Sequence, residues 1–411
     1  MYFKKISKCR VCSSTKVNSV FDLANVPFTG KFPKSEKIKI PKSPLNLGMC
    51  NKCKFVQLMH RFNSKYMYND EYGYESGVNS TMRNHLKKIV NKIKKLKKLD
   101  KKSVVMDIAS NDGTLLNFYP KNVIKIGIDP ILKRFKKNYK NIDYKISDFF
   151  SYKNFSKINL QKKVDVVTAF AVFYDIDNPN QFLRDIKKIL KNDGILILEQ
   201  SNLAKMINLN SFDTICQEHY GYYSTNVINL LLKKNNLTIF DLEYNDSNGG
   251  SSRYYIKHSE NNKIKVNNKN IKKALNFENT LMLEKKSTYK KFYLRIKNIK
   301  AKCQKIIKKI QMQKKTIHGY GASTKGNVII NHFNINKNQM PFISDRNPFK
   351  NNRYTPGSKI KIISEKRSRF KNPDYYFVLP WHFKKEILIR EKKMRAKGTK
   401  FIFPLPNFKI Y

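Results

Sequence analysis

The chain has 411 residues, 40% of them hydrophobic, and carries 83 lysine and arginine residues against 30 aspartate and glutamate residues, a formal net charge of +53. This length and apolar content are typical of a soluble globular protein with two or three domains. No apolar run is long enough to span a bilayer, and the N-terminus MYFKKISKCR lacks the apolar core of a signal peptide. We therefore expect a cytoplasmic protein without membrane association.

The large positive charge suggests a polyanionic partner, because clustered cations gain affinity by releasing counterions from phosphates. Lysine, asparagine and isoleucine are frequent along the whole chain, however, without a basic stripe or an RNA-binding motif, as an AT-rich coding sequence would produce. We therefore predict no nucleic-acid partner and expect an anionic small substrate, such as a nucleotide diphosphate. A basic zinc-containing nucleic-acid-binding protein stays open as an alternative.

Four of the six cysteines form two CxxC pairs near the N-terminus, Cys9 with Cys12 and Cys50 with Cys53. Two such knuckles bring four thiolates into a tetrahedron, which is the geometry of structural Zn²⁺ and leaves no open position for catalysis. Disulfides are the alternative, but a cytosolic chain keeps its thiols reduced. The spacing predicts a zinc-binding module over residues 1–66, whose folding depends on the metal.

A Tyr-rich segment and a lysine-rich helix, predicted over about Thr81–Leu99, lead to the most informative stretch of the chain, residues 104–129. Here a strand ends in Asp107, a turn of small residues opens a helix, and a second strand ends in Asp129. This pattern predicts a βαβ nucleotide-binding unit. The backbone N–H groups of the turn approach an anionic or carboxylate-bearing ligand, and the second acid lies where a ribose diol needs a carboxylate.

The turn is not the GxGxxG of dinucleotide-binding proteins, because Ala109 and Asn111 occupy the first two glycine positions and Gly113 follows. With no pyrophosphate to cradle, the DxAxNxG form suits S-adenosylmethionine better, since Asp107 can organise its methionine end. A dinucleotide site and a purely structural turn stay open at this point. Asp148, where a third strand would end, is a candidate for an adenine contact or a solvated loop acid.

Further strands are predicted at Val164–Ala169 and Gly194–Glu199, the second after the helix QFLRDIKKILKNDG. This alternation of strands and helices predicts a doubly wound sheet with mostly parallel strands. The middle of the chain, residues 67–261, is thus expected to form one α/β domain.

After about residue 262 a long basic helical stretch precedes a second strand–turn–helix, with its strand at Thr316–His318. Gly321, Ser323, Thr324 and Lys325 follow, and glycines, hydroxyls and a lysine at a helix N-terminus form an anion site in which the lysine can neutralise a phosphate. The spacing does not match a Walker A loop, so ATP hydrolysis is not indicated. A purely structural turn is the alternative.

The chemistry is expected in the loop SFDTICQEHYGYYS, residues 211–224, which follows the strand ending in Glu199. Loops at the carboxyl ends of strands in an open α/β sheet face the ligand crevice. His219 is the side chain of this loop that titrates near neutral pH, which makes it the candidate general base. Glu218 can orient it or hold a sugar hydroxyl, and Tyr222 can polarise a carbonyl. A partly buried loop whose polar groups satisfy one another is the alternative.

Several segments together resemble the nucleotide-sugar C-methyltransferases, and they occur in the order of that family. The segments are CRVC…CNKC, YGYESGVNSTMRNHL, DIASNDGTLL with GIDP, FYDIDNPNQFLRDI, DTICQEHYGYYS, NGGSSRYYIKH, GYGASTKGN, SDRNPFKNNRYTPG and VLPWHFKKEI. The resemblance implies an α/β fold with two Rossmann-like doubly wound sheets and a small N-terminal zinc-binding module. It implies a class I S-adenosylmethionine domain over residues 67–261 and a C-terminal Rossmann-like nucleotide-sugar-binding domain over 262–411.

The family's HEH-type loop corresponds to Gln217, Glu218 and His219, so the resemblance implies His219 as the base and Glu218 as its neighbour in the active site. Gln217 departs from the first histidine, which suggests different substrate contacts. Cys216 stands where some relatives carry a tyrosine and receives no role. Tyr74 matches a position near the sugar and receives a supporting role.

The resemblance also strengthens the phosphate-binding interpretation of the GYGASTKGN turn, and the substrate-binding residues expected there are Gly321, Ser323, Thr324, Lys325 and Asn327. A sugar C–H is acidic enough for removal only next to a ketone, so the implied substrate is a 4-keto nucleotide-sugar. His219 would remove the C3 proton while Tyr222, Tyr74 or backbone donors stabilise the enolate. An O- or N-methyltransferase stays open as an alternative, and we expect a monomer.

Overall fold

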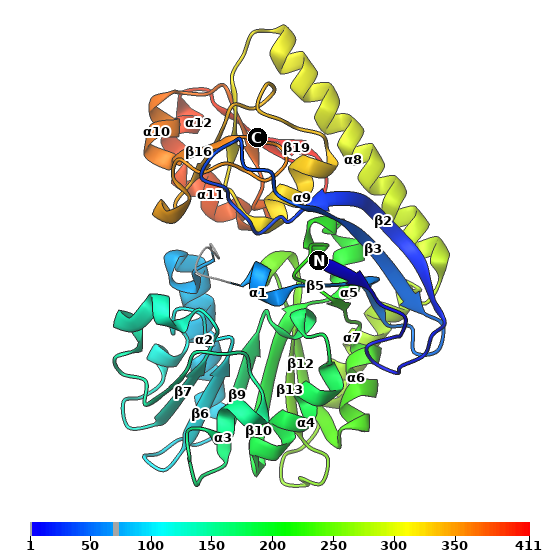
Figure 1. Cartoon of the computed structure of the whole chain (residues 1–411), viewed down its shortest axis with the longest axis vertical. Helices are drawn as coiled ribbons and strands as arrows, with labels where there is room; N and C mark the ends of the chain where they lie inside the picture. Colours follow the sequence, from blue (N-terminus) through cyan, green and yellow to red (C-terminus); the bar gives the residue numbers. More distant parts are fainter. Residues whose placement is uncertain (1, 69–73) are drawn as a thin grey trace.

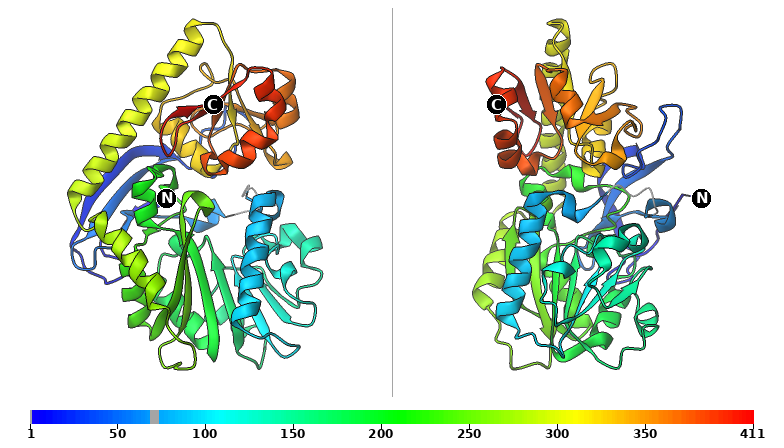
Figure 2. Two further views of the ribbon diagram at one scale, coloured as in Figure 1. Left: turned by 180° about the vertical axis from the view of Figure 1, so that it is seen from behind. Right: turned by 90° about the vertical axis from the view of Figure 1, so that its left-hand side faces the viewer.

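The computed structural model describes residues 2–68 and 74–411. A large α/β domain occupies one half of the molecule and a smaller one the other, with the N-terminal strands alongside both (Figures 1 and 2). In these described ranges no helix is both long and apolar enough to cross a membrane.

The N-terminal module contains a four-stranded antiparallel sheet of order β11-β4-β3-β2 and a two-stranded sheet of β1 and β5. Strand β11 belongs to the loop over residues 211–224, since Gly221 pairs with Gln57 and Tyr222 with Val56. The predicted active-site loop is therefore hydrogen-bonded into the N-terminal sheet. The elements are β1 (Phe3–Lys5), β2 (Val17–Pro27), β3 (Lys42–Cys50), β4 (Val56–Leu58), β5 (His60–Phe62), α1 (Ser64–Met67) and β11 (Gly221–Tyr222).

The central domain contains a seven-stranded sheet of order β12-β13-β10-β9-β6-β7-β8. Five neighbouring strands from β10 to β8 are parallel, and β13 and β12 extend the sheet as antiparallel strands. The strand order reverses between β6 and β9, so a ligand crevice is expected outside their carboxyl ends. The strands are β6 (Val104–Ile108), β7 (Ile124–Ile128), β8 (Tyr144–Ile146), β9 (Val164–Phe170), β10 (Leu190–Ser201), β12 (Leu237–Asn245) and β13 (Ser251–His258).

Helices cover both faces of this sheet, and the apolar run of β6 is accordingly buried throughout. Helix α4 shows why these segments are helical: Asn178 caps its N-terminus, a proline opens it, and its apolar residues repeat on one face. The helices are α2 (Ser80–Leu96), α3 (Tyr152–Ser156), α4 (Pro179–Ile189), α5 (Leu203–Asn208), α6 (Thr225–Lys234) and α7 (Asn268–Thr280).

The C-terminal domain has a six-stranded sheet of order β16-β15-β14-β17-β18-β19, parallel except for the last pair. Its first strand lies in the middle, as in the central domain, so the predicted fold class with two doubly wound sheets is confirmed. The strands are β14 (Ile317–Tyr320), β15 (Phe342–Asp345), β16 (Lys361–Ser364), β17 (Tyr375–Val378), β18 (Lys400–Phe403) and β19 (Lys409–Ile410). The helices are α8 (Lys286–Met312), α9 (Thr324–His332), α10 (Glu365–Phe370), α11 (Lys384–Arg390) and α12 (Lys392–Ala396).

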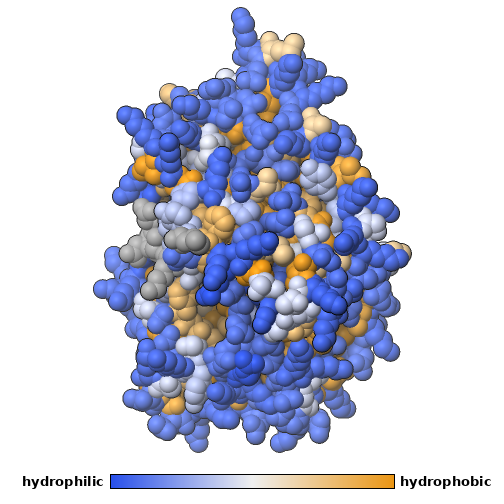
Figure 3. All heavy atoms as spheres, turned by 45° about the vertical axis from the view of Figure 1, so that its right-hand side comes forward, coloured by the Kyte–Doolittle hydropathy of each residue, from blue (hydrophilic) through white to orange (hydrophobic). Residues whose placement is uncertain are grey.

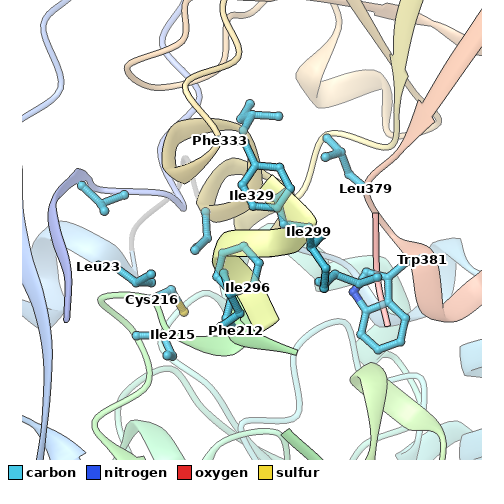
Figure 4. Packing of buried hydrophobic residues seen from close by; sticks show 14 of the residues in the cluster. Leu23, Phe212, Ile215, Cys216, Ile296, Ile299, Ile329, Phe333, Leu379 and Trp381 are labelled. Atoms are coloured by element: carbon cyan, nitrogen blue, oxygen red, sulfur yellow. The ribbon is translucent and has the colours of Figure 1, made fainter. Parts of the chain in front are cut away.

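One hydrophobic core joins strands of the N-terminal module, the loop over residues 211–224 and the C-terminal domain. Two further clusters lie on the central sheet, and one of them includes Cys9, Val11 and Cys50 of the N-terminal module. Figure 4 shows this joint core, in which Leu23 lies near Cys216, with Ile296 of α8 and Phe333 after α9 in the same cluster. Helix α8 buries one face, at spacings of three and four residues, beside β2. The loop is thus packed between two parts of the chain distant in sequence.

Two helical predictions are wrong in part. The turn after β6 does not open an α-helix but a single 3₁₀ turn, Leu116–Phe118. Pro120 follows at once and cannot continue a helix. The basic stretch after residue 262 is two helices, because Met282 adopts a left-handed φ of 48° between α7 and α8. α7 packs on β12 of the central domain, whereas α8 belongs to the joint core.

Candidate active site

The N-terminal module, the carboxyl ends of the central strands and the C-terminal domain enclose one cavity of about 500 Å³. Hydrophilic side chains cover most of the face shown in Figure 3, and apolar side chains gather near its middle. The predicted site residues that line the cavity are Tyr74, Ala109, Asn111, Asp129, Glu218, His219, Ser323, Thr324 and Lys325. Those absent from its lining are Asp107, Gly113, Asp148, Tyr222, Gly321 and Asn327.

The turn after β6 is built from left-handed residues. Ala109 has φ 58°, Asn111 has φ 50° and Gly113 has φ 73°. Glycine adopts this conformation freely and asparagine tolerates it, so the backbone strain lies at Ala109. Asp129 holds the turn, since its Oδ2 accepts the Asn111 N–H at 2.9 Å and its Oδ1 accepts the Ile131 N–H at 2.9 Å. Strain of this kind at a cavity wall is typical of a ligand-binding turn.

The remaining acids of this half differ in environment. Asp107 is buried at the end of β6, where its Oδ1 accepts from the Thr168 hydroxyl at 2.6 Å and burial raises its pKa to about 7. Asp148 is exposed and its Oδ1 accepts the N–H of Phe149, whose ring lines the cavity. Neither carboxylate forms part of the cavity wall. Asp107 precedes the turn that borders the cavity, and Asp148 precedes Phe149, which lines it.

His219 lines the cavity and has an unprotonated ring nitrogen. Its Nδ1 lies 2.6 Å from the carbonyl oxygen of Thr214, and because a carbonyl oxygen only accepts, Nδ1 carries the hydrogen and Nε2 is an acceptor. The ring packs against Tyr174, with centroids 4.0 Å apart. Burial lowers the pKa of His219 to about 3, and the charge of Lys325 acts in the same direction. A neutral imidazole with this orientation can act as a general base.

We expect the His219 ring to stay neutral between pH 8 and pH 5. The unfolded chain takes up a proton on this histidine near pH 6.5, whereas the folded protein disfavours the charged ring. The contribution of His219 to the free energy of unfolding therefore decreases as the pH falls below 6.5. NMR titration of the histidine ring protons, assigned with His219→Asn, measures this. A His219 midpoint near 6.5 would contradict the expected environment.

Gln217 fastens the loop to the N-terminal module instead of facing the cavity. It is fully buried, and its oxygen accepts from the N–H and hydroxyl of Thr29. Its amide donates to the carbonyls of Val26 and Pro27 and to the Ser43 hydroxyl, all at 3.1 Å. The departure from histidine at this position therefore concerns the anchoring of the loop.

Glu218 lies where the three parts of the chain meet. It is 5% exposed and lines the cavity, and its Oε2 has no hydrogen-bond partner in the part of the chain that the structure describes. A Cβ on Gly30 would lie 2.2 Å from Glu218 Oε1 and 3.6 Å from the hydroxyl oxygen of Thr324. A side chain at residue 30 would therefore displace the Glu218 carboxylate from this position. Burial raises the pKa of Glu218 and, more strongly, of the adjacent Cys216 thiol.

The two predicted tyrosines differ in position. Tyr74 lines the cavity and is 45% exposed. Tyr222 is buried, its hydroxyl donates to the Thr214 carbonyl at 3.5 Å, and it borders a separate cavity of about 10 Å³. The structure thus brings Tyr74, but not Tyr222, to the main cavity.

The C-terminal turn contributes a cation. Ser323 caps α9 through its hydroxyl, which accepts the Gly326 N–H at 2.9 Å, and Lys325 donates to the Asn248 carbonyl at 2.7 Å. Lys325 also lies 3.6 Å from Asp213. Gly321 makes the turn with φ 82° against Pro380. The buried Asn327 donates to the Thr29 carbonyl at 2.7 Å, so it links the turn to the N-terminal module.

The cavity lining also includes polar residues that were not predicted from the sequence, among them Tyr68, Asp175, Lys350 and His382. Asp175 follows the end of β9, and its position after a parallel strand could have marked it as a candidate site residue. Lys350 is buried, and its ammonium donates to the Ala322 carbonyl at 2.6 Å. Tyr68 and His382 come from segments whose place at the cavity depends on domain packing.

The four N-terminal cysteines form a cluster outside the cavity. Cys9 and Cys53 have sulfur atoms 3.6 Å apart, Cys12 and Cys50 have theirs 3.5 Å apart, and all four lie within 4.8 Å of one another. All thiols are free. Tetrahedral Zn²⁺ with bonds of about 2.3 Å requires sulfurs about 3.8 Å apart, so the cluster fits this ion.

Comparison with protein families identifies the class. A zinc binding domain matches residues 9–68, a methyltransferase domain matches 78–242, and a C-methyltransferase C-terminal domain matches 246–406. The fold and the cavity thus belong to a methyltransferase. Because the three matches follow one another in this order, the chain belongs to the C-methyltransferase family that combines these domains, and the resemblance seen in the sequence motifs is confirmed.

A full-length relative agrees with this assignment. The chain is 24% identical over 412 residues to the C-methyltransferase NovU of Streptomyces niveus, covering 99% of this chain and 97% of that protein. Two similar solved structures are an S-adenosylmethionine-dependent methyltransferase from Clostridium acetobutylicum ATCC 824 and the N-methyltransferase NodS from Bradyrhizobium japonicum WM9. The first has a TM-score of 0.34, 13% identity and coverage of 43% of this chain and 92% of that one. The second has a TM-score of 0.34, 15% identity and coverage of 47% and 94%.

Proposed function

We propose that this C-methyltransferase acts on a keto nucleotide-sugar, at C3 of a 4-keto sugar, through base-catalysed enolate formation. The observation that carries the proposal is the Nε2 acceptor of His219 in a cavity bordered by the strained turn after β6 and by the Lys325 turn. A carbon acid next to a ketone needs a positioned base, and a nucleotide diphosphate needs a cation.

The turn after β6 is proposed to hold S-adenosylmethionine. The carboxylate of Asp129 at the cavity wall suits a ribose diol, while Ala109 and Asn111 offer backbone groups to the rest of the ligand. Asp107 and Gly113 then support the turn from behind, and Asp148 is proposed to reach the adenine amino group beside the Phe149 ring. When bound, S-adenosylmethionine supplies an electrophilic methyl group.

The opposite wall is proposed to hold the sugar diphosphate. Ser323, Thr324 and Lys325 lie at the N-terminus of α9, where a lysine ammonium and the helix dipole both favour a negative charge. Gly321 and Asn327 would act indirectly, by shaping the turn and fixing it to the N-terminal module. These roles put the two reactants in the same cavity as His219.

In the proposed mechanism, His219 takes the C3 proton on Nε2 while the electron pair moves to the ketone oxygen. The Thr214 carbonyl faces Nδ1–H and stabilises the imidazolium that forms. Glu218 and Tyr74 line the same cavity, and Glu218 would hold a sugar hydroxyl there. Positioning of the two reactants and exclusion of water would contribute most of the rate.

Zn²⁺ is proposed at Cys9, Cys12, Cys50 and Cys53, with a structural role. The four free thiols and their mutual distances support this assignment. Four thiolates complete a tetrahedron, so such an ion would have no open position for a substrate.

Incubation with S-adenosylmethionine and a panel of GDP- and dTDP-linked 4-keto sugars tests the proposed reaction. We expect NMR of the product to show a new methyl group bound to carbon. A methoxy or N-methyl product would instead support an O- or N-methyltransferase.

We expect Asp129→Ala to weaken S-adenosylmethionine binding by roughly 10- to 100-fold, because hydrogen bonds to a charged group contribute about 1.5–3 kcal/mol. Calorimetric titration measures the Kd. Asp193→Asn, at an exposed acid paired with Lys97 and remote from the cavity, is the control and should bind as the wild type does. Unchanged affinity in Asp129→Ala would remove Asp129 from the cofactor site.

A further inference from the structure

Asp175, a residue of the cavity wall, has a buried carboxyl oxygen that no hydrogen-bond donor within residues 2–68 and 74–411 satisfies. The residue ends the short 3₁₀ helix Phe173–Asp175 after β9 and lines the cavity. Its Oδ2 accepts from the hydroxyl of Tyr68 at 2.8 Å, whereas its Oδ1 is buried and has no hydrogen-bond partner among the described residues. A buried polar atom of this kind at a cavity wall indicates a contact with a ligand.

The surroundings of Asp175 favour its protonated form. Burial raises its pKa well above the ordinary value, and the nearby carboxylate of Glu218 raises it further, while only the Tyr68 hydroxyl opposes the shift. Since Tyr68 donates to Oδ2, the acid proton belongs on Oδ1. Asp175 then offers an O–H to the cavity, where a carboxylate would offer only an acceptor.

The backbone holds this acid beside the proposed base. Tyr174, the residue before Asp175, packs its ring against the His219 ring, and its carbonyl accepts the Tyr220 N–H at 2.7 Å. The donor of Asp175 and the acceptor of His219 therefore lie on two short segments that are locked together. An imidazole of low proton affinity can remove a proton from carbon only if the oxygen that gains charge is stabilised.

We propose that Asp175 is a catalytic residue which donates its Oδ1 hydrogen to the substrate ketone oxygen and stabilises the enolate, with Tyr68 as its positioning residue. This inference rests on the proposed function. The C–H bond breaks, its proton goes to His219 Nε2, and its electron pair moves to the oxygen that faces Asp175. The proton of Asp175 stays on its carboxyl group. The carbonyl re-forms when the carbon bonds to the methyl group of S-adenosylmethionine, and the electron pair of the broken S–CH₃ bond stays on sulfur, which gives S-adenosylhomocysteine.

Two substitutions at residue 175 distinguish the role of a hydrogen-bond donor from the role of a charged carboxylate. Asp175→Asn keeps an N–H donor and an oxygen for the Tyr68 hydroxyl, so kcat should stay within about fivefold of the wild type. Asp175→Ala removes the donor, and loss of one oxyanion donor costs about 10²- to 10³-fold in kcat. KM and the Kd for S-adenosylmethionine should change little in either variant. Equal loss in both variants, with an active wild type, would overturn the inference.

Infrared difference spectroscopy, wild type minus Asp175→Asn, tests the protonation without any substrate. At pH 7 we expect the C=O stretch of a protonated carboxylic acid, and carboxylate bands would overturn the inference.

Deuterium exchange at the carbon next to the ketone, in D₂O with a dTDP-linked 4-keto sugar, should be slow in Asp175→Ala and retained in Asp175→Asn. If the wild type methylates oxygen or nitrogen instead of carbon, the proposed function fails, and the donor role fails with it even if the infrared signal is present.

Discussion

His219→Asn is expected to abolish methyl transfer while the protein stays folded. The Asn amide can replace Nδ1–H in the hydrogen bond to the Thr214 carbonyl, but it has no group at the position of Nε2. Since a positioned general base contributes about 10²- to 10⁴-fold, we expect kcat to fall at least about 10³-fold. The Kd for S-adenosylmethionine should remain within about twofold, because His219 does not belong to the turn after β6.

Single-turnover assays with the sugar panel measure the loss, and calorimetry measures the binding. His60→Asn is the matched control, because His60 is half-buried in β5 and does not line the cavity. Retained turnover in His219→Asn would show that the base lies elsewhere in the cavity, with Glu218 as the next candidate.

Metal removal is expected to unfold the N-terminal module and to inactivate the enzyme. Structural Zn²⁺ contributes apparent binding free energies of about 10–16 kcal/mol in zinc-finger peptides, and that binding is coupled to folding. The module here also pairs with β11 and holds Gln217, so its unfolding would release the loop that carries His219. Cys9→Ser, or treatment with a strong chelator, should therefore cost both zinc and activity.

Elemental analysis measures the zinc, and thermal unfolding measures the stability. We expect one zinc per chain in the wild type and a loss of metal in Cys9→Ser. Cys303→Ala is the control, because this buried thiol of α8 lies outside the four-cysteine cluster. It should keep its metal and lose only modest stability. Absence of zinc from the wild type would contradict the proposed site.

The predicted residues that do line the cavity are those whose position depends on local geometry. Asp129 ends a strand and Ala109 begins a turn, so the direction of the chain alone brings both to the carboxyl edge of the sheet. The Lys325 turn follows the same rule in the second sheet. Tyr222, in contrast, lies in a strand of the N-terminal sheet, and that pairing turns its side chain away from the main cavity.

The contacts that sequence reasoning missed join segments that are distant in the chain. Tyr68 reaches Asp175 across 107 positions, and Gln217 is held by Thr29 across 188 positions. No local pattern contains such pairs, because they form only when separate sheets pack together.

The sequence by itself determined the strand–turn–helix periodicity of two α/β domains, the four-cysteine knuckles and the acids that end strands, since each depends on residues close in the chain. The tertiary structure alone decided which of these residues share one cavity. It also decided that His219 is neutral with Nε2 as an acceptor and that Gln217 serves as an anchor. Burial and hydrogen-bond partners set these properties, and both come from packing the N-terminal module, the active-site loop and the C-terminal domain around one core.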